Sequence, residues 1–330
     1  MRTRVLPLLV ITLGIMAVAR AQESRSLELT QTVTFPSLHG GFNHMSVDAK
    51  RQRLFAAAPT NATVEVIDLR SGKPLRSLKS ERPAAVRYAP EFDQLYVSSG
   101  QRVYVYDGET LNVIISIDLQ SRLDELQYDA QAKELYVGCM SEGETSVAVI
   151  AIPSGKLQGK IPLPGRPQGI AVEQKGSRIF ANVPSHEKVA VVDRRRRALH
   201  ALWPVKQVKG NTPIALDAAD HRLFLGGREP PRLIVLDTRT GNQVAEVSID
   251  GFADDMFWDP ARRLIYISCG EGFVDVIEQR DADHYLQLQR VTTVEGAATS
   301  AFSPELDGLY VGVPRREDKP AEIRVFKIGR

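Results

Sequence analysis

The sequence predicts an all-β fold, a single seven-bladed β-propeller with four-stranded blades. A unit of short Val- and Ile-rich runs, separated by Gly, Pro and Ser turns, recurs seven times along the 330 residues. One Leu or Ile marks each unit and returns every 40 to 44 residues, at positions 54, 95, 135, 179, 223, 265 and 309. Self-similarity at this period, with only strands inside each unit, is typical of a propeller.

The copy at 166–193 shows the unit most clearly. Three apolar runs separated by turn-forming residues predict three antiparallel strands, at 170–172, 179–181 and 189–192. A fourth strand follows most units after a glycine-containing turn, as at 74–78. Each unit therefore supplies one four-stranded blade.

The two ends of the chain complement each other. The last unit ends at Arg330 after only three strands, whereas the alternating segment 27–35 precedes the first unit. We expect 27–35 to be the outer strand of the seventh blade, paired with 323–326, so that the ring closes without an unpaired edge. The alternative is a frayed terminal strand that leaves this edge open.

The second strand of each unit resembles the tetrapeptide that names the YVTN-type (YncE-like) β-propeller repeat family. The matching sequences are Leu-Tyr-Val-Ser at 95–98, Leu-Tyr-Val-Gly at 135–138 and 309–312, and Ile-Phe-Ala-Asn at 179–182. The resemblance extends over about residues 27–330, although no copy reads Tyr-Val-Thr-Asn. It implies an exported seven-bladed propeller, often without an assigned activity.

Residues 1–21 are expected to be a signal peptide, and residues 22–330 to form the propeller domain. A basic start and the apolar segment 5–18 precede an Ala-Arg-Ala cleavage site. The apolar segment is too short to predict a membrane span. We therefore expect an exported protein, periplasmic or extracellular, with no membrane span after cleavage.

The charge balance argues against a nucleic-acid partner. The chain has 42 Lys and Arg against 40 Asp and Glu, and cleavage of the signal peptide would leave it near neutral. The run 194–197, four consecutive arginines, is the local exception. It is either a solvated turn between the third and fourth strands of blade 4 or a dock for an anion.

The two cysteines are expected to be free. Cys139 and Cys269 occupy the same repeat position, at the end of the second strand, but in blades 3 and 6. These blades lie on nearly opposite sides of a seven-membered ring, whereas a disulfide needs Cα atoms within about 7 Å. Packing as small apolar side chains is the preferred interpretation.

Residues just before the first strand of each blade should surround the mouth of the central channel. Aligning the seven units places arginines on one wall, carboxylates on blades 3 and 6, and a histidine on blade 1. Trp258 is expected between blades, and His186 in a solvated loop. The candidate ligand-binding residues are Arg82, Arg122, Arg166, Asn43, His44, Asp124, Glu125, Gln168, Asp254 and Asp255.

This set supports two chemistries. The three arginines come from adjacent blades and favour a carboxylate or phosphate ligand, unless Asp124, Glu125 and Glu81 pair with them as a salt-bridged rim. The carboxylates and the histidine could instead hold a divalent cation, with His44, Glu125 and Asp255 as its ligands, or act as a general base.

The sequence therefore predicts an exported binding or scaffold protein of the cell envelope. Its channel mouth would engage a small anionic ligand or a protein partner. The alternative is an enzyme, a lactonase-type hydrolase in which a metal or a carboxylate/His site activates water on a cyclic ester. Propellers host both functions. The sequence contains neither a Gly-x-Ser-x-Gly elbow nor a His-Glu-x-x-His motif, so it assigns no catalytic residue.

Overall fold

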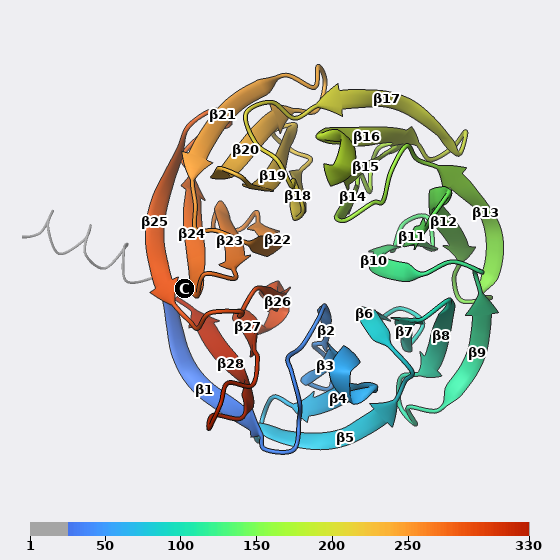
Figure 1. Cartoon of the computed structure of the whole chain (residues 1–330), viewed down its shortest axis with the longest axis vertical. Coiled ribbons are helices and arrows are strands. Elements are labelled where there is room, and N and C mark those ends of the chain that lie inside the picture. Colours follow the sequence, from blue (N-terminus) through green and yellow to red (C-terminus); the bar gives the residue numbers. More distant parts are fainter. Residues whose placement is uncertain (1–25, 330) are drawn as a thin grey trace, which may run out of the picture.

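A computed structural model describes residues 26–329, which form seven four-stranded antiparallel sheets arranged around a central axis (Figure 1). The predicted seven-bladed propeller is confirmed. The predicted signal peptide lies outside the described residues. Among residues 26–329, no helix combines the length and the apolar character needed to cross a bilayer.

The first four blades follow one another along the chain. Blade 1 contains β2 (Met45–Asp48), β3 (Arg53–Ala58), β4 (Thr63–Asp68) and β5 (Lys73–Lys79). Blade 2 contains β6 (Pro83–Ala89), β7 (Gln94–Ser99), β8 (Arg102–Asp107) and β9 (Val113–Asp118). Blade 3 contains β10 (Leu123–Asp129), β11 (Glu134–Ser141), β12 (Glu144–Ala151) and β13 (Lys156–Pro162). Blade 4 contains β14 (Ile170–Val172), β15 (Arg178–Val183), β16 (Lys188–Asp193) and β17 (Ala198–Pro204).

The remaining blades complete the ring. Blade 5 contains β18 (Ile214–Asp217), β19 (Arg222–Arg228), β20 (Pro231–Asp237) and β21 (Gln243–Ser248). Blade 6 contains β22 (Ala253–Asp259), β23 (Leu264–Cys269), β24 (Phe273–Gln279) and β25 (Tyr285–Thr292). Blade 7 contains β26 (Thr299–Ser303), β27 (Gly308–Val313), β28 (Ala321–Ile328) and β1 (Leu27–Phe35). Single 3₁₀ turns occupy Pro59–Asn61, Pro184–His186 and Pro304–Leu306.

The second and third strands carry the core, because neighbouring blades cover both of their faces. Every residue of β3 and β23 is buried, whereas the outer strand β5 buries only Leu78. The repeated aromatic of the second strand is fully buried at Tyr96, Tyr136 and Tyr266. The continuous apolar runs of the repeat are thus the sequence signature of strands buried on both faces.

A repeated aspartate closes the turn after each of several first strands. The carboxylates of Asp48, Asp129, Asp217 and Asp259 are buried, and each accepts a hydrogen bond from a backbone N–H two or three residues later. Such a turn satisfies a backbone donor that the sheet leaves free. This bond explains why the aspartate recurs with the repeat.

The arginine run at 194–197 is neither a fully solvated turn nor a free dock for an anion. Arg194 forms an ion pair with Asp129, and Arg197 lies 3.4 Å from Glu134, so both arginines join blade 4 to blade 3. Arg196 remains 83% exposed. Their partners belong to the preceding blade, so the local turn sequence does not reveal them.

The ring closes as predicted. Strand β1 pairs with β28 in an antiparallel register that places Val33 opposite Ile323 and Leu29 opposite Phe326. Figure 1 shows the first and last strands side by side in blade 7. Cys139 and Cys269 are buried free thiols in β11 and β23, which also confirms the blade alignment.

The β1 latch gives a first prediction. Val33 is 2% exposed in the core of blade 7, whereas the neighbouring Thr32 is exposed. Val33→Asp should lower the free energy of unfolding by about 3 kcal/mol or more, because it buries a charge without a partner. Thr32→Asp, opposite Arg324, should change it by about 0.5 kcal/mol or less. Urea unfolding of both variants provides the measurement.

A truncated chain tests the same latch. A protein that begins at Pro36 lacks β1 and exposes the edge of β28, so it should aggregate or melt well below the longer chain. Equal melting temperatures for the two chains would show that β1 does not hold the ring closed.

Candidate ligand site in the central channel

A cavity of about 880 Å³ lies among the first strands, which surround the central axis of the ring (Figure 1). All seven blades contribute to its lining, but blades 4, 5 and 6 supply most of the wall. A volume near 880 Å³ falls within the range of about 300–1,000 Å³ that is usual for small-molecule sites. The cavity is therefore large enough for a ligand of ordinary metabolite size.

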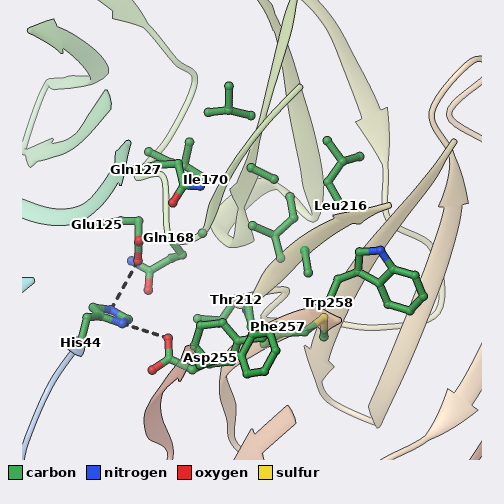
Figure 2. Close-up of a pocket in the computed structure, with 18 of the residues that line it drawn as sticks. His44, Glu125, Gln127, Gln168, Ile170, Thr212, Leu216, Asp255, Phe257 and Trp258 are labelled. Carbon is green, nitrogen blue, oxygen red and sulfur yellow. Dashed lines mark hydrogen bonds and ion pairs between the residues drawn. The ribbon is translucent and has the colours of Figure 1, made fainter. Parts of the chain in front are cut away.

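The cavity is polar at one end and apolar along its wall. Residues before or at the start of the first strands supply the polar end, and the apolar wall follows further along the strands of blades 4 to 6 (Figure 2). The predicted residues that line the cavity are Asn43, His44, Asp124, Glu125, Gln168, Asp254 and Asp255. The apolar wall includes Ile170, Ile214, Leu216, Phe257 and Trp258.

His44 crosses the polar end and joins three blades. Its Nδ1 lies 3.0 Å from Oδ1 of Asp255 in blade 6, and its Nε2 lies 3.5 Å from Oε2 of Glu125 in blade 3 (Figure 2). His44 itself belongs to the loop that enters blade 1. The imidazole thus forms an ion-paired bridge between carboxylates on two distant blades.

Further donors hold these carboxylates in place. Arg87 Nη2 lies 3.3 Å from Oε1 of Glu125, and the backbone N–H of Ser300 donates to Oδ2 of Asp255 at 2.7 Å. Asp254 accepts a hydrogen bond from Arg228 Nη2 at 2.6 Å. Three of the four carboxylates at the polar end therefore have a positively charged partner.

Asp124 is the exception. Its carboxylate has no hydrogen bond or ion pair with any side chain or backbone group of residues 26–329, although its backbone carbonyl accepts from Ser98 Oγ at 2.9 Å. The side chain is half-buried and lines the cavity. An acceptor with two oxygens thus faces the cavity without a donor.

Burial and charge shift the protonation of this group of side chains. Burial lowers the pKa of His44, but the fields of Asp255 and Glu125 outweigh burial and raise that pKa well above its usual value. Burial raises the pKa values of Asp124, Glu125 and Asp254, with the charge of His44 opposing it. The raised pKa of His44 and the carboxylates at both of its ring nitrogens favour the imidazolium form, which has no lone pair with which to act as a general base.

The predicted metal ligands are close together but do not surround a common point. Glu125 and Asp255 contact different nitrogens of His44, so the imidazole ring separates the two carboxylates. A divalent cation would need all three ligands within about 2–2.5 Å of one centre. Within residues 26–329, no group of three or more His, Cys, Asp and Glu side chains is arranged to hold a metal ion.

The three predicted arginines do not line the cavity. Arg82, Arg122 and Arg166 are exposed, and none forms an ion pair with Glu81, Asp124, Glu125 or any other described carboxylate. The salt-bridged rim is therefore wrong. The backbone N–H groups of Arg82 and Arg122 donate to Ser99 and Ser141, so the two loops share one geometry. An anion site at these arginines stays a prediction.

Some cavity residues escaped the sequence analysis. Gln127 and Phe257 line the cavity two residues beyond the predicted Glu125 and Asp255, and Arg87 lines it from the first strand of blade 2. Side chains two residues apart on a strand face the same side, so the period of two could have found them. Trp258 packs against Phe224 at a ring distance of 5.4 Å, as expected, and also reaches the cavity. His186 is exposed, as predicted.

The described residues define a seven-bladed β-propeller with a cavity of ligand size in its channel. No protein-family model matches the chain. Two curated proteins described as uncharacterized protein YncE, from Salmonella typhimurium strain LT2 and Salmonella typhi, are 25% and 24% identical to it over 202 residues. The matches include 60% of this chain and 56% of each relative, so the chain spans just over half the length of these relatives.

Solved structures share the fold. A chain of Kuenenia stuttgartiensis hydrazine synthase matches with a TM-score of 0.73 and 16% identity, covering 86% of this chain and 97% of that chain. A chain of a mitotic checkpoint complex matches with a TM-score of 0.78 and 14% identity, covering 100% and 97%. At these identities, the structural matches show the fold alone. The sequence matches, together with the seven blades, support a YncE-like propeller family for this chain.

The His44 bridge gives a second prediction. His44→Gln removes the positive charge between two buried carboxylates and should lower the free energy of unfolding by about 3 kcal/mol near pH 6. Because folding raises the pKa of His44, its contribution is complete below the unfolded value of about 6.5 and is lost as the pH rises through the folded value. The difference in the free energy of unfolding between wild type and variant should therefore become smaller in alkaline solution.

His186→Gln is the matched control, because His186 lies in an exposed loop and its side chain forms a hydrogen bond with the neighbouring Ser185 but no ion pair among the described residues. This variant should unfold like the wild type from pH 6 to pH 10. Urea unfolding of the three proteins across this range measures the effect. A constant gap between wild type and His44→Gln would mean that His44 is not protonated in the folded protein.

Proposed function

We propose that this protein is an exported binding protein whose channel cavity takes up a small molecule. The observation that carries the proposal is a cavity of about 880 Å³ that combines an apolar wall with polar side chains that lack partners. Besides Asp124, the side-chain amides of Asn43 and Gln127 have no hydrogen bond within residues 26–329. Such groups fix the orientation of a bound ligand, while the apolar wall contributes affinity.

Export is part of the proposal and rests on the basic start, the apolar segment and the Ala-Arg-Ala sequence within residues 1–21. N-terminal sequencing of the protein from the cell envelope should find Gln22 first. Recovery of the intact chain in the cytoplasm would contradict export while leaving the binding function open.

The geometry favours binding over lactone hydrolysis. A hydrolase of the type considered above needs a base that takes a proton from water, or ligands that share a metal. Both ring nitrogens of His44 face carboxylates, and these carboxylates raise its pKa, which favours the protonated form over a free base. We therefore propose binding, and measurable hydrolysis of a lactone by this protein would contradict that proposal.

A cavity-filling variant tests the binding function. Leu216 lies in the apolar wall, so Leu216→Trp should fill part of the cavity and abolish ligand binding. Leu199→Trp is the matched control, because Leu199 is 38% exposed on the outer strand β17. A thermal-shift screen of small metabolites and lactones should find compounds that stabilise the wild type and the control but not Leu216→Trp. Compounds that stabilise all three equally, or turnover of a lactone, would contradict the proposal.

The exposed arginines support an anionic group on the ligand or on a protein partner, held outside the cavity. For an anionic ligand found in that screen, Arg122→Ala should raise the Kd about tenfold or more, since a charge-assisted hydrogen bond contributes about 1.5–3 kcal/mol. Arg196→Ala removes an exposed arginine from the opposite face and should leave the Kd unchanged. Equal effects of the two variants in calorimetric titration would exclude a specific anion site.

A further inference from the structure

We infer that the cavity binds a small organic cation, with an ammonium group beside Asp124 and an apolar or aromatic body against the wall of blades 4 to 6. This inference rests on the proposed binding function and names the chemical class of its ligand. Two features support it: a carboxylate at the polar end that no cation contacts, and the composition of the wall.

The charges at the polar end do not balance within the protein. Four carboxylates, Asp124, Glu125, Asp254 and Asp255, meet three cations, His44, Arg87 and Arg228. Each of the three cations contacts a carboxylate other than Asp124. Asp124, which lines the cavity, therefore has no cation in contact with it, and only the more distant charges of His44 and Arg122 act to lower its pKa.

Asp124 needs a donor that the protein does not supply. A half-buried carboxylate without a hydrogen bond loses part of its hydration without compensation, and burial accordingly raises the pKa of Asp124 above its usual value. An ammonium group would supply both an N–H donor and a positive charge, and charge-assisted bonds of this kind are the stronger ones. An anionic head at this place would face Asp124, Glu125 and Asp254 together and would be repelled.

The remaining cation in the lining lies elsewhere. Lys175 follows β14, whereas Asp124 lies at the start of β10, so the two residues are at opposite ends of the first strands. Lys175 is also exposed. It cannot neutralise Asp124, and it does not change the character of the polar end.

The wall selects the rest of the ligand. Ile170, Ile214 and Leu216 offer aliphatic surface. Phe257 and Trp258 add aromatic rings (Figure 2). Aromatic faces attract organic cations as well as apolar groups. A molecule that places an ammonium at the polar end can therefore lay an aromatic or aliphatic body along this wall.

Three probes with one aromatic body and different heads test the inference: 2-phenylethylammonium, 2-phenylethanol and 3-phenylpropionate. Titration calorimetry near pH 7 with the wild type should give a Kd for the ammonium at least tenfold below that of the alcohol, and no binding of the carboxylate. The alcohol probe tests a neutral donor, because its hydroxyl group can also donate a hydrogen bond to a carboxylate.

Two matched variants locate the effect. Asp124→Asn keeps the shape but removes the charge, so it should raise the Kd for the ammonium at least tenfold and leave the alcohol within about twofold. Glu81→Gln removes an exposed carboxylate from a neighbouring loop and should change neither. Because Asp124 has no partner in the protein, Asp124→Asn should melt at or above the wild-type temperature, which confirms that it folds.

Failure of this inference can be told apart from failure of the proposed function. Suppose that the alcohol or the carboxylate binds as tightly as the ammonium and that Leu216→Trp abolishes this binding. The inference of a cationic ligand would then be wrong, whereas the proposed binding function of the cavity would stand. Ammonium binding that Asp124→Asn does not weaken would do the same. Binding of every probe to Leu216→Trp as to the wild type, or no binding of any probe at 10 mM, would contradict both.

Discussion

The pairing of β1 with β28 is the contact on which the rest of the structure depends. It completes blade 7 with a strand from the opposite end of the chain. The loop that follows β1 then runs directly to the channel, where Arg315 N donates to Gly40 O at 2.7 Å and Thr299 Oγ1 donates to Phe42 O at 3.1 Å. Blade 7 therefore holds this loop in place, and the closed ring is what brings His44 within reach of blades 3 and 6.

Charged side chains add a second level of connection between blades. Arg51 of blade 1 contacts Asp93 of blade 2 at 2.5 Å, and Arg262 of blade 6 contacts Asp307 of blade 7 at 2.6 Å. Exposed ion pairs contribute little to stability, but Arg51 and Arg262 also contact Asp48 and Asp259, which are fully buried. These arginines therefore satisfy aspartates that the turns require and, with the same guanidinium group, set the position of the next blade.

The sequence was sufficient for the ring and for part of the site. Period and strand pattern predicted the seven blades, the β1 latch and the two separated thiols, because each follows from repetition and chain length. Alignment of the repeats also predicted which loops reach the channel, as His44 and Asp255 show. It could not predict the direction of a long side chain, so the exposed position of Arg122 emerged only from the structure.

Contacts between blades were the second feature that the sequence could not predict. Arg194 looked like part of a solvated turn, because its partner Asp129 lies 65 residues away in another blade. The arrangement of the predicted metal ligands lay beyond the sequence for a related reason. Sequence position brought His44, Glu125 and Asp255 to one end of the channel, but it carries no information on which imidazole nitrogen faces which carboxylate.

The asymmetry of the channel follows from these unequal loops on an almost regular scaffold. A seven-bladed ring leaves an axial space that the main chain does not fill, and side chains decide how that space is divided. On the side next to blades 1 to 3, Glu125 forms ion pairs with both His44 and Arg87, whereas blades 4 to 6 contribute the apolar wall. The free volume therefore lies beside the apolar wall, with Asp124 at its polar end. A regular repeat builds the ring, and departures from the repeat at a few channel positions give this propeller a site of its own.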